Sequence, residues 1–408
     1  MKNMKPKFFY GYIIVLVAFF IMLVMWGAIY SFGIFFKPLL TEFGWTRAET
    51  SGAYSLFMVL HGLVYILTGR LNDKFGPRIV LAVSGLFLGL GYLLMSQVSA
   101  IWQLYLFYGV VIAMGMGGTV PLMSTVARWF TRRRGLVTGI VMSGSGLGTM
   151  IMPPMASWLI SSYGWPVSYL VIGIITLVLV ILAAQFLRRD PTQIGQLPYG
   201  ADKVKGEGLN LEVGGFSLGA AIRTRQFWML AVMFLFWAFC VQVIMVHIVP
   251  HAIDTGISPA SAAGILTIIG GLGIAGRVIM GGSGDRIGNR LALIISFMLI
   301  VLALSWVVAA EGMWMLCLFA IIFGFAYGGS VALQSPLVAD LFGLRAHGAI
   351  LGATAFASSI GGAIGPLLAG YIFDITSSYY LAFLVSVTIS IVGLVLVSLL
   401  TPISQVRR

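Results

Sequence analysis

The chain contains a series of long apolar stretches, and this feature limits its possible folds more than any other. Most stretches hold about 20 or more residues, the length that an α-helix needs to cross the hydrocarbon core of a bilayer. Of the 408 residues, 60% are hydrophobic and only 9% are charged, whereas an ordinary soluble domain is about 25% charged. The predicted spans are residues 10–36, 51–68, 79–98, 101–128, 134–162, 166–187, 227–252, 259–282, 291–309, 313–339, 348–373 and 378–401.

The length of these stretches and their lack of strict alternation predict helices rather than barrel strands. We therefore expect an all-α membrane protein with twelve transmembrane helices. The first stretch is too long for a signal-peptide core and is expected to remain as a permanent span. The main polar stretch separates two sets of six helices, which predicts an N-terminal bundle over residues 1–190, a linker over 191–219 and a C-terminal bundle over 220–408.

The formal net charge of +12 does not indicate a nucleic-acid-binding protein, because the basic residues fall in small groups between the apolar stretches. If the N-terminus is cytoplasmic, all of the 24 Lys and Arg residues except Lys37, Arg47 and Arg277 lie on the cytoplasmic side or at that membrane edge. The positive-inside rule then places both termini in the cytoplasm. We expect a multi-pass protein of the cell membrane, surrounded by lipid. The two cysteines, Cys240 and Cys317, lie in apolar runs and imply no disulfide framework.

Two cytoplasmic loops repeat the pattern Gly-x-x-x-Asp-x-x-Gly-x-Arg, and all four positions are displaced by the same number of residues. The loops are Gly69-Arg-Leu-Asn-Asp73-Lys-Phe-Gly76-Pro-Arg78 and Gly281-Gly-Ser-Gly-Asp285-Arg-Ile-Gly288-Asn-Arg290. Such duplication is typical of alternating-access transporters, whose site lies between the halves near the membrane midplane. We expect the charged loop residues to make ion pairs and helix-end contacts that latch the bundles when the cytoplasmic side is closed.

The repeated loop resembles the signature of the major facilitator superfamily. More specifically, Phe9-Tyr-Gly-Tyr-Ile-Ile-Val and Tyr30-Ser-Phe-Gly-Ile-Phe-Phe-Lys37 resemble the first helix of the monocarboxylate transporter family, and the run from Trp129 to Gly146 resembles that family's entry into helix 5. The resemblance implies two six-helix bundles with helices 1, 4, 7 and 10 nearest the cavity, and symport of lactate- or pyruvate-like anions with a proton. Bacterial oxalate/formate exchangers are similar too, and share the Arg-Thr-Arg-Gln-Phe-Trp lead-in to helix 7.

Arg277 is the candidate substrate anchor. It precedes Asp285 by eight residues, about 12 Å of helix, so it lies deep within a hydrocarbon half-thickness of roughly 15 Å. The twelve acidic residues all lie near loops or helix ends, and an unpaired guanidinium suits a carboxylate ligand. Gly270 and Gly273 on the same helix face leave space for a small ligand. The alternative is that the glycines only allow close packing and Arg277 bonds to backbone carbonyls. In the resembled family, an arginine on helix 8 holds the substrate carboxylate, and Arg277 matches it.

The chain departs from many members of that family at two positions. A helix-8 aspartate is replaced here by Gly273, and a helix-1 lysine by Tyr30. Proton coupling would then depend on the substrate acid itself or on a histidine. His247 and His61 are the candidates. His247 is also a candidate substrate-binding residue, because it enters the outer part of the cavity if helix 7 lines it. The alternative for each is a structural, hydrogen-bonded histidine.

Three aromatic residues, Tyr30, Tyr327 and Phe356, are candidates for the cavity wall, because a lactate-sized ligand needs an apolar cover as well as a polar anchor. The alternative is ordinary aromatic packing. No spacing of His, Cys or carboxylates suits a metal, and no nucleotide loop or other cofactor site is apparent in the sequence.

The leading hypothesis is a proton-coupled carrier of small monocarboxylates that works as a monomer, with Arg277 binding the carboxylate. A second hypothesis is an anion exchanger of the oxalate/formate type. A membrane enzyme is disfavoured, because the sequence shows no nucleophile–base pair. A receptor-like sensor is disfavoured because the central loop and tails are too short for a signalling domain.

Overall fold

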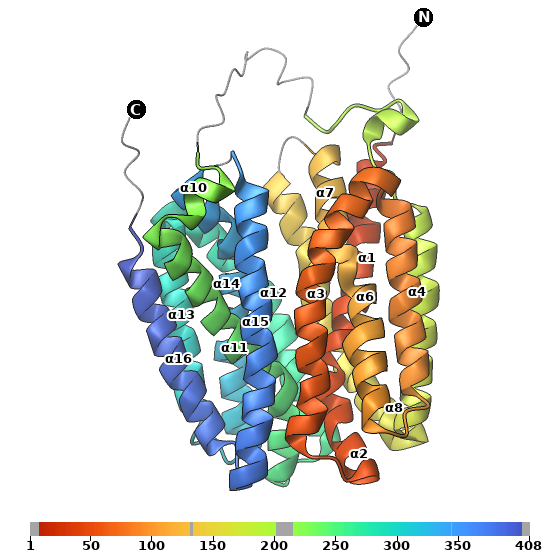
Figure 1. Ribbon diagram of the computed structural model, residues 1–408, viewed down its shortest axis with the longest axis vertical. Coiled ribbons are helices and arrows are strands. Elements are labelled where there is room, and N and C mark those ends of the chain that lie inside the picture. The colour runs from red at the N-terminus through yellow and green to blue at the C-terminus, as the bar shows by residue number, and fades with distance from the viewer. Residues whose placement is uncertain (1–7, 131–133, 201–214, 344, 402–408) are drawn as a thin grey trace, which may run out of the picture.

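The computed structural model describes residues 8–130, 134–200, 215–343 and 345–401, and its regular structure is helical throughout (Figure 1). This confirms the expectation of an all-α protein. The first part of the chain forms α1 Gly11–Tyr30, α2 Phe32–Phe43, α3 Arg47–Phe75, α4 Pro77–Met95, α5 Ile101–Leu104, η1 Tyr105–Ile112, α6 Ala113–Gly115, η2 Met116–Gly118, α7 Thr119–Trp129, α8 Arg134–Gln185 and η3 Pro191–Ile194. The second part forms α10 Leu218–Ile222, α11 Arg225–Asp254, α12 Pro259–Ile287, α13 Asn289–Val307, α14 Met313–Phe342, α15 His347–Thr376 and α16 Tyr380–Leu399.

Among the described residues, 11 helical segments are long and apolar enough to cross a membrane. The difference from the twelve expected spans lies in α8, whose 52 residues join two helices across a kink at Gly164. Gly164 has a φ of 82°, which an L side chain rarely adopts, and Pro166 follows it. At 1.5 Å per residue the whole segment would measure about 78 Å if straight, more than twice the bilayer core. The count of twelve therefore depends on treating α8 as two spans.

The helices of the first half occupy one side of the molecule and those of the second half the other (Figure 1). The halves meet where α3 packs on α15, α8 on α12 and α2 on α11. Glycines bring α8 and α12 into backbone contact: a Cβ at Gly270 would lie 2.6 Å from the carbonyl oxygen of Gly146. Small residues at helix interfaces are a common means of close packing in membranes.

Local sequence signals set several helix ends. Thr46 and Glu49 form a capping box at the start of α3, in which each side chain bonds the other residue's backbone N–H. Thr224 caps α11, and Ser258 caps α12 just before Pro259.

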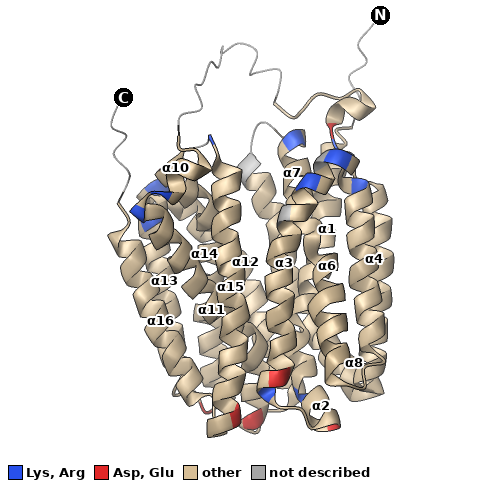
Figure 2. Cartoon of the chain, viewed as in Figure 1, with Lys and Arg blue, Asp and Glu red and all other residues tan. Residues whose placement is uncertain are grey.

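Lysine and arginine gather at the end of the molecule where α1 begins and α16 ends, which we call the terminal end (Figure 2). We call the opposite end, where α2 meets α11, the α2 end. The positive-inside rule predicts that the end rich in Lys and Arg faces the cytoplasm, which is the basis for expecting both termini there. Which end faces the cytoplasm stays a prediction. The expected linker, residues 191–219, is described except for 201–214.

The expected latch residues lie at the terminal end. Arg78 Nε donates to Gln185 Oε1 at 2.8 Å, and the guanidinium of Arg290 donates to the backbone carbonyls of Val397 and Ser398. Both arginines thus bond within their own half, where they make helix-end contacts. Asp285 is exposed on α12. Asp73 belongs to α3, but its side chain lies outside the described residues, so the latch stays a prediction.

We expect Gly270→Ala to destabilise the protein, because the new methyl group would meet the backbone of Gly146 and Met150, which cannot move aside independently. Overpacking of this kind costs about 1–3 kcal/mol. The thermal unfolding midpoint of purified protein in detergent measures the effect. Gly282→Ala on the same helix is the control, because a Cβ there meets nothing within 4 Å. Equal midpoints for the two variants would contradict the proposed close contact.

Candidate functional site

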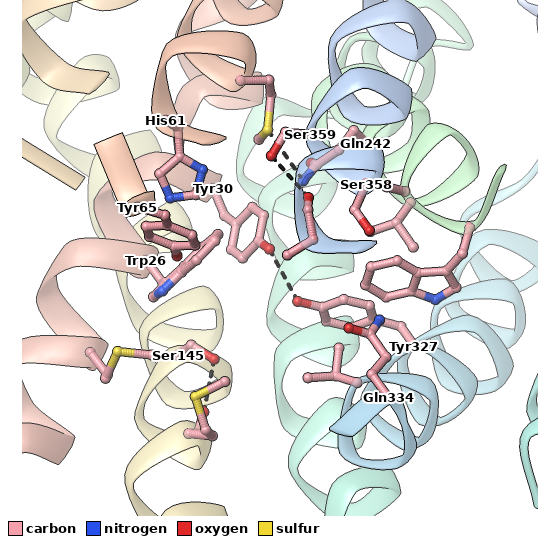
Figure 3. Close-up of a pocket in the computed structure, with 18 of the residues that line it drawn as sticks. Trp26, Tyr30, His61, Tyr65, Ser145, Gln242, Tyr327, Gln334, Ser358 and Ser359 are labelled. Carbon is pink, nitrogen blue, oxygen red and sulfur yellow. Dashed lines mark hydrogen bonds between the residues drawn. The ribbon is translucent and has the colours of Figure 1, made fainter. Parts of the chain in front are cut away.

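A cavity of about 190 Å³ lies between the two halves and is lined by residues of both. The first half contributes side chains of α1, α3 and α8, and the second half contributes side chains of α11, α12, α14 and α15 (Figure 3). Most of the wall is apolar, with methionine, valine, alanine and aromatic residues. The volume is below the roughly 300–1,000 Å³ of pockets for drug-sized ligands, so the cavity suits a smaller molecule.

Arg277 is the one lysine or arginine among the residues that line this cavity, and no lining residue is acidic. Its side chain is 7% exposed. One terminal nitrogen donates to the backbone oxygen of Met142 on α8 at 3.0 Å, and the guanidinium carbon lies 5.8 Å from the ring centroid of Tyr327. The guanidinium therefore has a carbonyl acceptor from the opposite half. This agrees with the alternative interpretation, in which Arg277 bonds to backbone carbonyls. Its charge has no carboxylate partner among the lining residues.

Four buried nitrogen atoms on the cavity wall lack a hydrogen-bond partner among the described residues. They are Nε of Arg277, Nε1 of Trp237, Nε2 of Gln334 and Nε2 of His61. The first three can only donate, and the fourth donates or accepts according to its tautomer. Leaving such a group buried and unpaired costs about 1–3 kcal/mol. The wall is therefore short of acceptors, which a bound anion with several oxygen atoms would supply.

Two tyrosines join the halves across the cavity. The hydroxyls of Tyr30 on α1 and Tyr327 on α14 are 3.1 Å apart, and their side chains point toward each other in Figure 3. Tyr54 on α3 donates to Oε1 of Gln242 on α11 at 3.0 Å, which is a second bond between the halves. Opening the cavity by separating α1 from α14 would break the first bond.

The structure brings four of the six residues expected at the site together: Arg277, Tyr30, Tyr327 and His61 all line the cavity. Phe356 is not among the lining residues, and its ring instead faces Gly62.

His247 is also absent from the cavity wall, contrary to the expectation that it enters the outer cavity. Its side chain is fully buried between helices. One ring nitrogen lies 2.9 Å from the Tyr379 hydroxyl and the other 2.9 Å from the Pro366 carbonyl oxygen, with Ser51 Oγ at 3.3 Å. These bonds join α11 to α15, to α3 and to the start of α16. The placement matches the alternative of a structural histidine.

Several polar lining residues were not predicted from the sequence, and Trp237, Gln242 and Gln334 are the largest with side-chain N–H donors. Each places a hydrogen-bonding group within a long apolar segment. Such groups in spans usually face protein or a cavity, so their presence could have marked them as candidate lining residues. The helix phase needed to tell them from packing residues comes only from the fold.

An ion cluster at the α2 end was not predicted from the sequence. Asp254, the last residue of α11, pairs with Lys37 of α2 at 2.5 Å and with Arg47 of α3 at 2.6 Å. Asp374 of α15 accepts the backbone N–H groups of Arg47 and Ala48 at 2.9 and 2.8 Å. Each of these contacts joins the two halves.

An aromatic contact supports the same cluster. The guanidinium carbon of Arg47 lies 3.5 Å from the ring centroid of Phe373, and Arg47 also donates to the Tyr379 hydroxyl. Arg47 is only 8% exposed, so its interactions are screened less by solvent than those of surface pairs. The α2 end is thus closed by bonds between the halves.

A cavity between two helical halves near the middle of the spans is the place where many transporters bind their substrates. A family model described as "Major Facilitator Superfamily" matches residues 15–310 and 254–408. The chain belongs to this superfamily. It is therefore a transporter and not an enzyme, and the members to which it is similar carry more specific names.

Monocarboxylate transporter 13 of Bos taurus is 28% identical over 382 residues, which cover 92% of this chain and 86% of the relative. The oxalate:formate antiporter of Oxalobacter formigenes is 30% identical over 394 residues, covering 92% and 88%. Monocarboxylate transporter 4 of Gallus gallus is 28% identical over 362 residues, covering 86% and 74%. These relatives confirm the resemblance to the monocarboxylate transporters.

A solved structure agrees on the superfamily fold. It is a bacterial homologue of the human lysosomal transporter Spinster, in an inward-facing and occupied conformation. The TM-score is 0.75 over 97% of both chains, at 14% sequence identity. At this identity the similarity shows the fold alone.

We expect Asp254→Asn to loosen the α2 end, because it removes the carboxylate that two cations share. A cysteine at the buried position Ser51, in a background without Cys240 and Cys317, would report the change. The rate of labelling by a membrane-impermeant maleimide should rise in Asp254→Asn.

The matched control is Glu311→Gln, which removes an exposed carboxylate near the start of α14. It should leave the labelling rate unchanged. If Asp254→Asn labels no faster than the control, the ion cluster does not hold this end closed.

Proposed function

We propose that the protein is a secondary transporter of small monocarboxylates of the lactate or pyruvate type. The observation that carries this proposal is the set of unpaired donors around the cavity, centred on a guanidinium without a carboxylate partner. A carboxylate oxygen can accept from Arg277 with the strength of a charge-assisted bond. The remaining oxygen atoms of a 2-hydroxy or 2-oxo acid can accept from Trp237 or Gln334.

The rest of the cavity suits the apolar end of such a substrate. Met22, Met58, Val241 and Val331 line the wall, and thioether and branched aliphatic side chains favour a methyl group over a second charge. The names of the monocarboxylate transporter relatives support the same substrate class.

Transport would proceed by rocking of residues 1–190 against 220–408. With the α2 end closed by ion pairs between the halves, the cavity of this conformation would communicate with the terminal end. The concentration of Lys and Arg at that end supports its assignment to the cytoplasm (Figure 2). The described conformation would then be inward-facing, in a multi-pass protein of the cell membrane.

Proton coupling is part of the proposal. No lining residue of the cavity is acidic, so the proton would travel with the substrate acid or on His61, whose Nε2 is buried and unpaired. His247 is the weaker candidate, because both of its ring nitrogens already have partners.

Anion exchange is the second candidate function, and the oxalate:formate antiporter supports it as a relative. A doubly charged substrate would favour a second cation in the site. The cavity wall carries one arginine and no lysine, which favours a monocarboxylate.

We expect Arg277→Ala to abolish uptake of labelled lactate into proteoliposomes. Removing one partner of a buried, charged hydrogen bond costs about 2–5 kcal/mol of binding, which corresponds to a loss of roughly 30-fold to several thousand-fold. Arg277→Lys should recover only part of the uptake, because lysine lacks the planar fork.

Arg286→Ala is the control for this series, since Arg286 is an exposed residue in the last turn of the same helix. Its uptake should equal that of the unaltered protein. Full uptake in a well-expressed Arg277→Ala variant would refute the carboxylate-binding role.

We expect an inward proton gradient to drive lactate accumulation in proteoliposomes without internal anion. His61→Gln should weaken this response if the histidine carries the proton, and should preserve it if the substrate acid does. Accumulation that ignores the gradient but requires internal oxalate, formate or lactate would instead establish exchange. Liposomes preloaded with each anion measure the difference.

A further inference from the structure

A second pocket, of about 260 Å³, lies at the terminal end and shares no lining residue with the central cavity. One wall is the turn between α3 and α4, residues 74–79. The other wall is the segment after α8, with Leu187, Arg188, Arg189 and Gln193. The transport mechanism proposed above makes no use of this pocket.

The pocket is strongly cationic. Four of its ten lining residues are basic, namely Lys74, Arg78, Arg188 and Arg189, and none is acidic. Like charges held this close repel one another unless an anion lies among them. The pocket therefore has the charge of an anion-binding site.

Arg78 and Arg188 make side-chain hydrogen bonds to neutral groups. Arg78 donates to the amide oxygen of Gln185. Arg188 donates to the backbone carbonyls of Gln185 and Leu187 at 3.1 and 3.2 Å. Such bonds fix the guanidinium groups in place without neutralising them.

Asp190, a described carboxylate beside the pocket, is already shared. Asp190 lies 3.8 Å from Arg189 Nε and 3.3 Å from Arg128 Nη1. One carboxylate between two arginines cannot also balance Lys74, Arg78 and Arg188. The described side chains that line the pocket therefore carry a net positive charge of the kind that attracts phosphate.

The position of the pocket favours a lipid over a free ion. It lies where α4 begins, at the start of an apolar helix long enough to span a membrane. Phe75 and Ile79 line it and are 49% and 53% exposed, so apolar surface adjoins the cations. A ligand with an anionic head and acyl chains fits both features, whereas inorganic phosphate uses only the first.

We propose that this pocket binds the headgroup phosphate of an anionic phospholipid in the leaflet at the terminal end. The phosphate would lie between the α3–α4 turn and the segment after α8, and would tie the two together. Because α3 also packs on α15 of the other half, the lipid would steady a helix that both halves use.

The test measures binding of phosphatidylglycerol to the purified full-length protein by native mass spectrometry, with phosphatidylcholine of the same chain length for comparison. The pocket variant Lys74→Gln/Arg188→Gln keeps hydrogen-bonding side chains and removes two charges. Its affinity for phosphatidylglycerol should fall about 30-fold, from the contribution of each basic side chain to anionic-lipid binding. Phosphatidylcholine binding should be weak and unchanged.

The matched control is Arg223→Gln/Arg225→Gln, which removes two exposed charges at the same end but outside the pocket. It should keep the phosphatidylglycerol affinity. Equal losses in the two variants, or equal retention of the two lipids, would overturn the proposal. If inorganic phosphate at the same concentration displaces the lipid completely, the site belongs to free anions instead.

A thermal-shift measurement separates binding from folding defects. Phosphatidylglycerol should raise the unfolding midpoint of the unaltered protein and of the control variant. The pocket variant should have a similar midpoint without lipid and a smaller rise with it. A rise of full size in the pocket variant would contradict the site.

Discussion

A polar group in the hydrocarbon core of a membrane is stable only when it has a hydrogen-bond partner, and the rest of this structure depends on that constraint. The backbone meets it by forming helices throughout the spans. Trp237, Gln334 and the Nε of Arg277 do not meet it within the described part of the chain. Other buried groups, such as the hydroxyls of Tyr92 and Tyr169, also lack a partner in the described residues, but these three nitrogen atoms line one cavity, where a ligand would complete their bonding.

The sequence predicts the helices well, because span length and composition are local properties. The sequence predicts two spans, 134–162 and 166–187, at the place where α8 divides. It does not predict that the two helices join directly at a kink, which the structure places at Gly164. Arg277 is found from sequence because a deep charge is rare in a span. The surroundings of His247 could not be predicted, because a histidine in a span can face a cavity or a neighbouring helix, and only packing decides which.

The two ends of the molecule use charge in opposite ways. At the α2 end, Lys37, Arg47 and Asp254 pair across the halves. At the terminal end, Lys74, Arg78 and Arg188 line a pocket that holds no acid. Both patterns require residues that are far apart in sequence to meet, so neither could be read from the loops alone. The repeated Gly-x-x-x-Asp-x-x-Gly-x-Arg pattern indicated only that charges were concentrated there.

The bond from Arg277 to the Met142 carbonyl joins α12 to α8, and thus one half to the other. Whenever the halves tilt apart at this point, the guanidinium loses a neutral acceptor and its unshared donors increase. The same arginine would then hold an anion more tightly in one orientation than in the other. Under the proposed mechanism, the carrier would bind its anion with unequal affinities on its two sides. Flux from the side of higher affinity would then saturate at the lower substrate concentration.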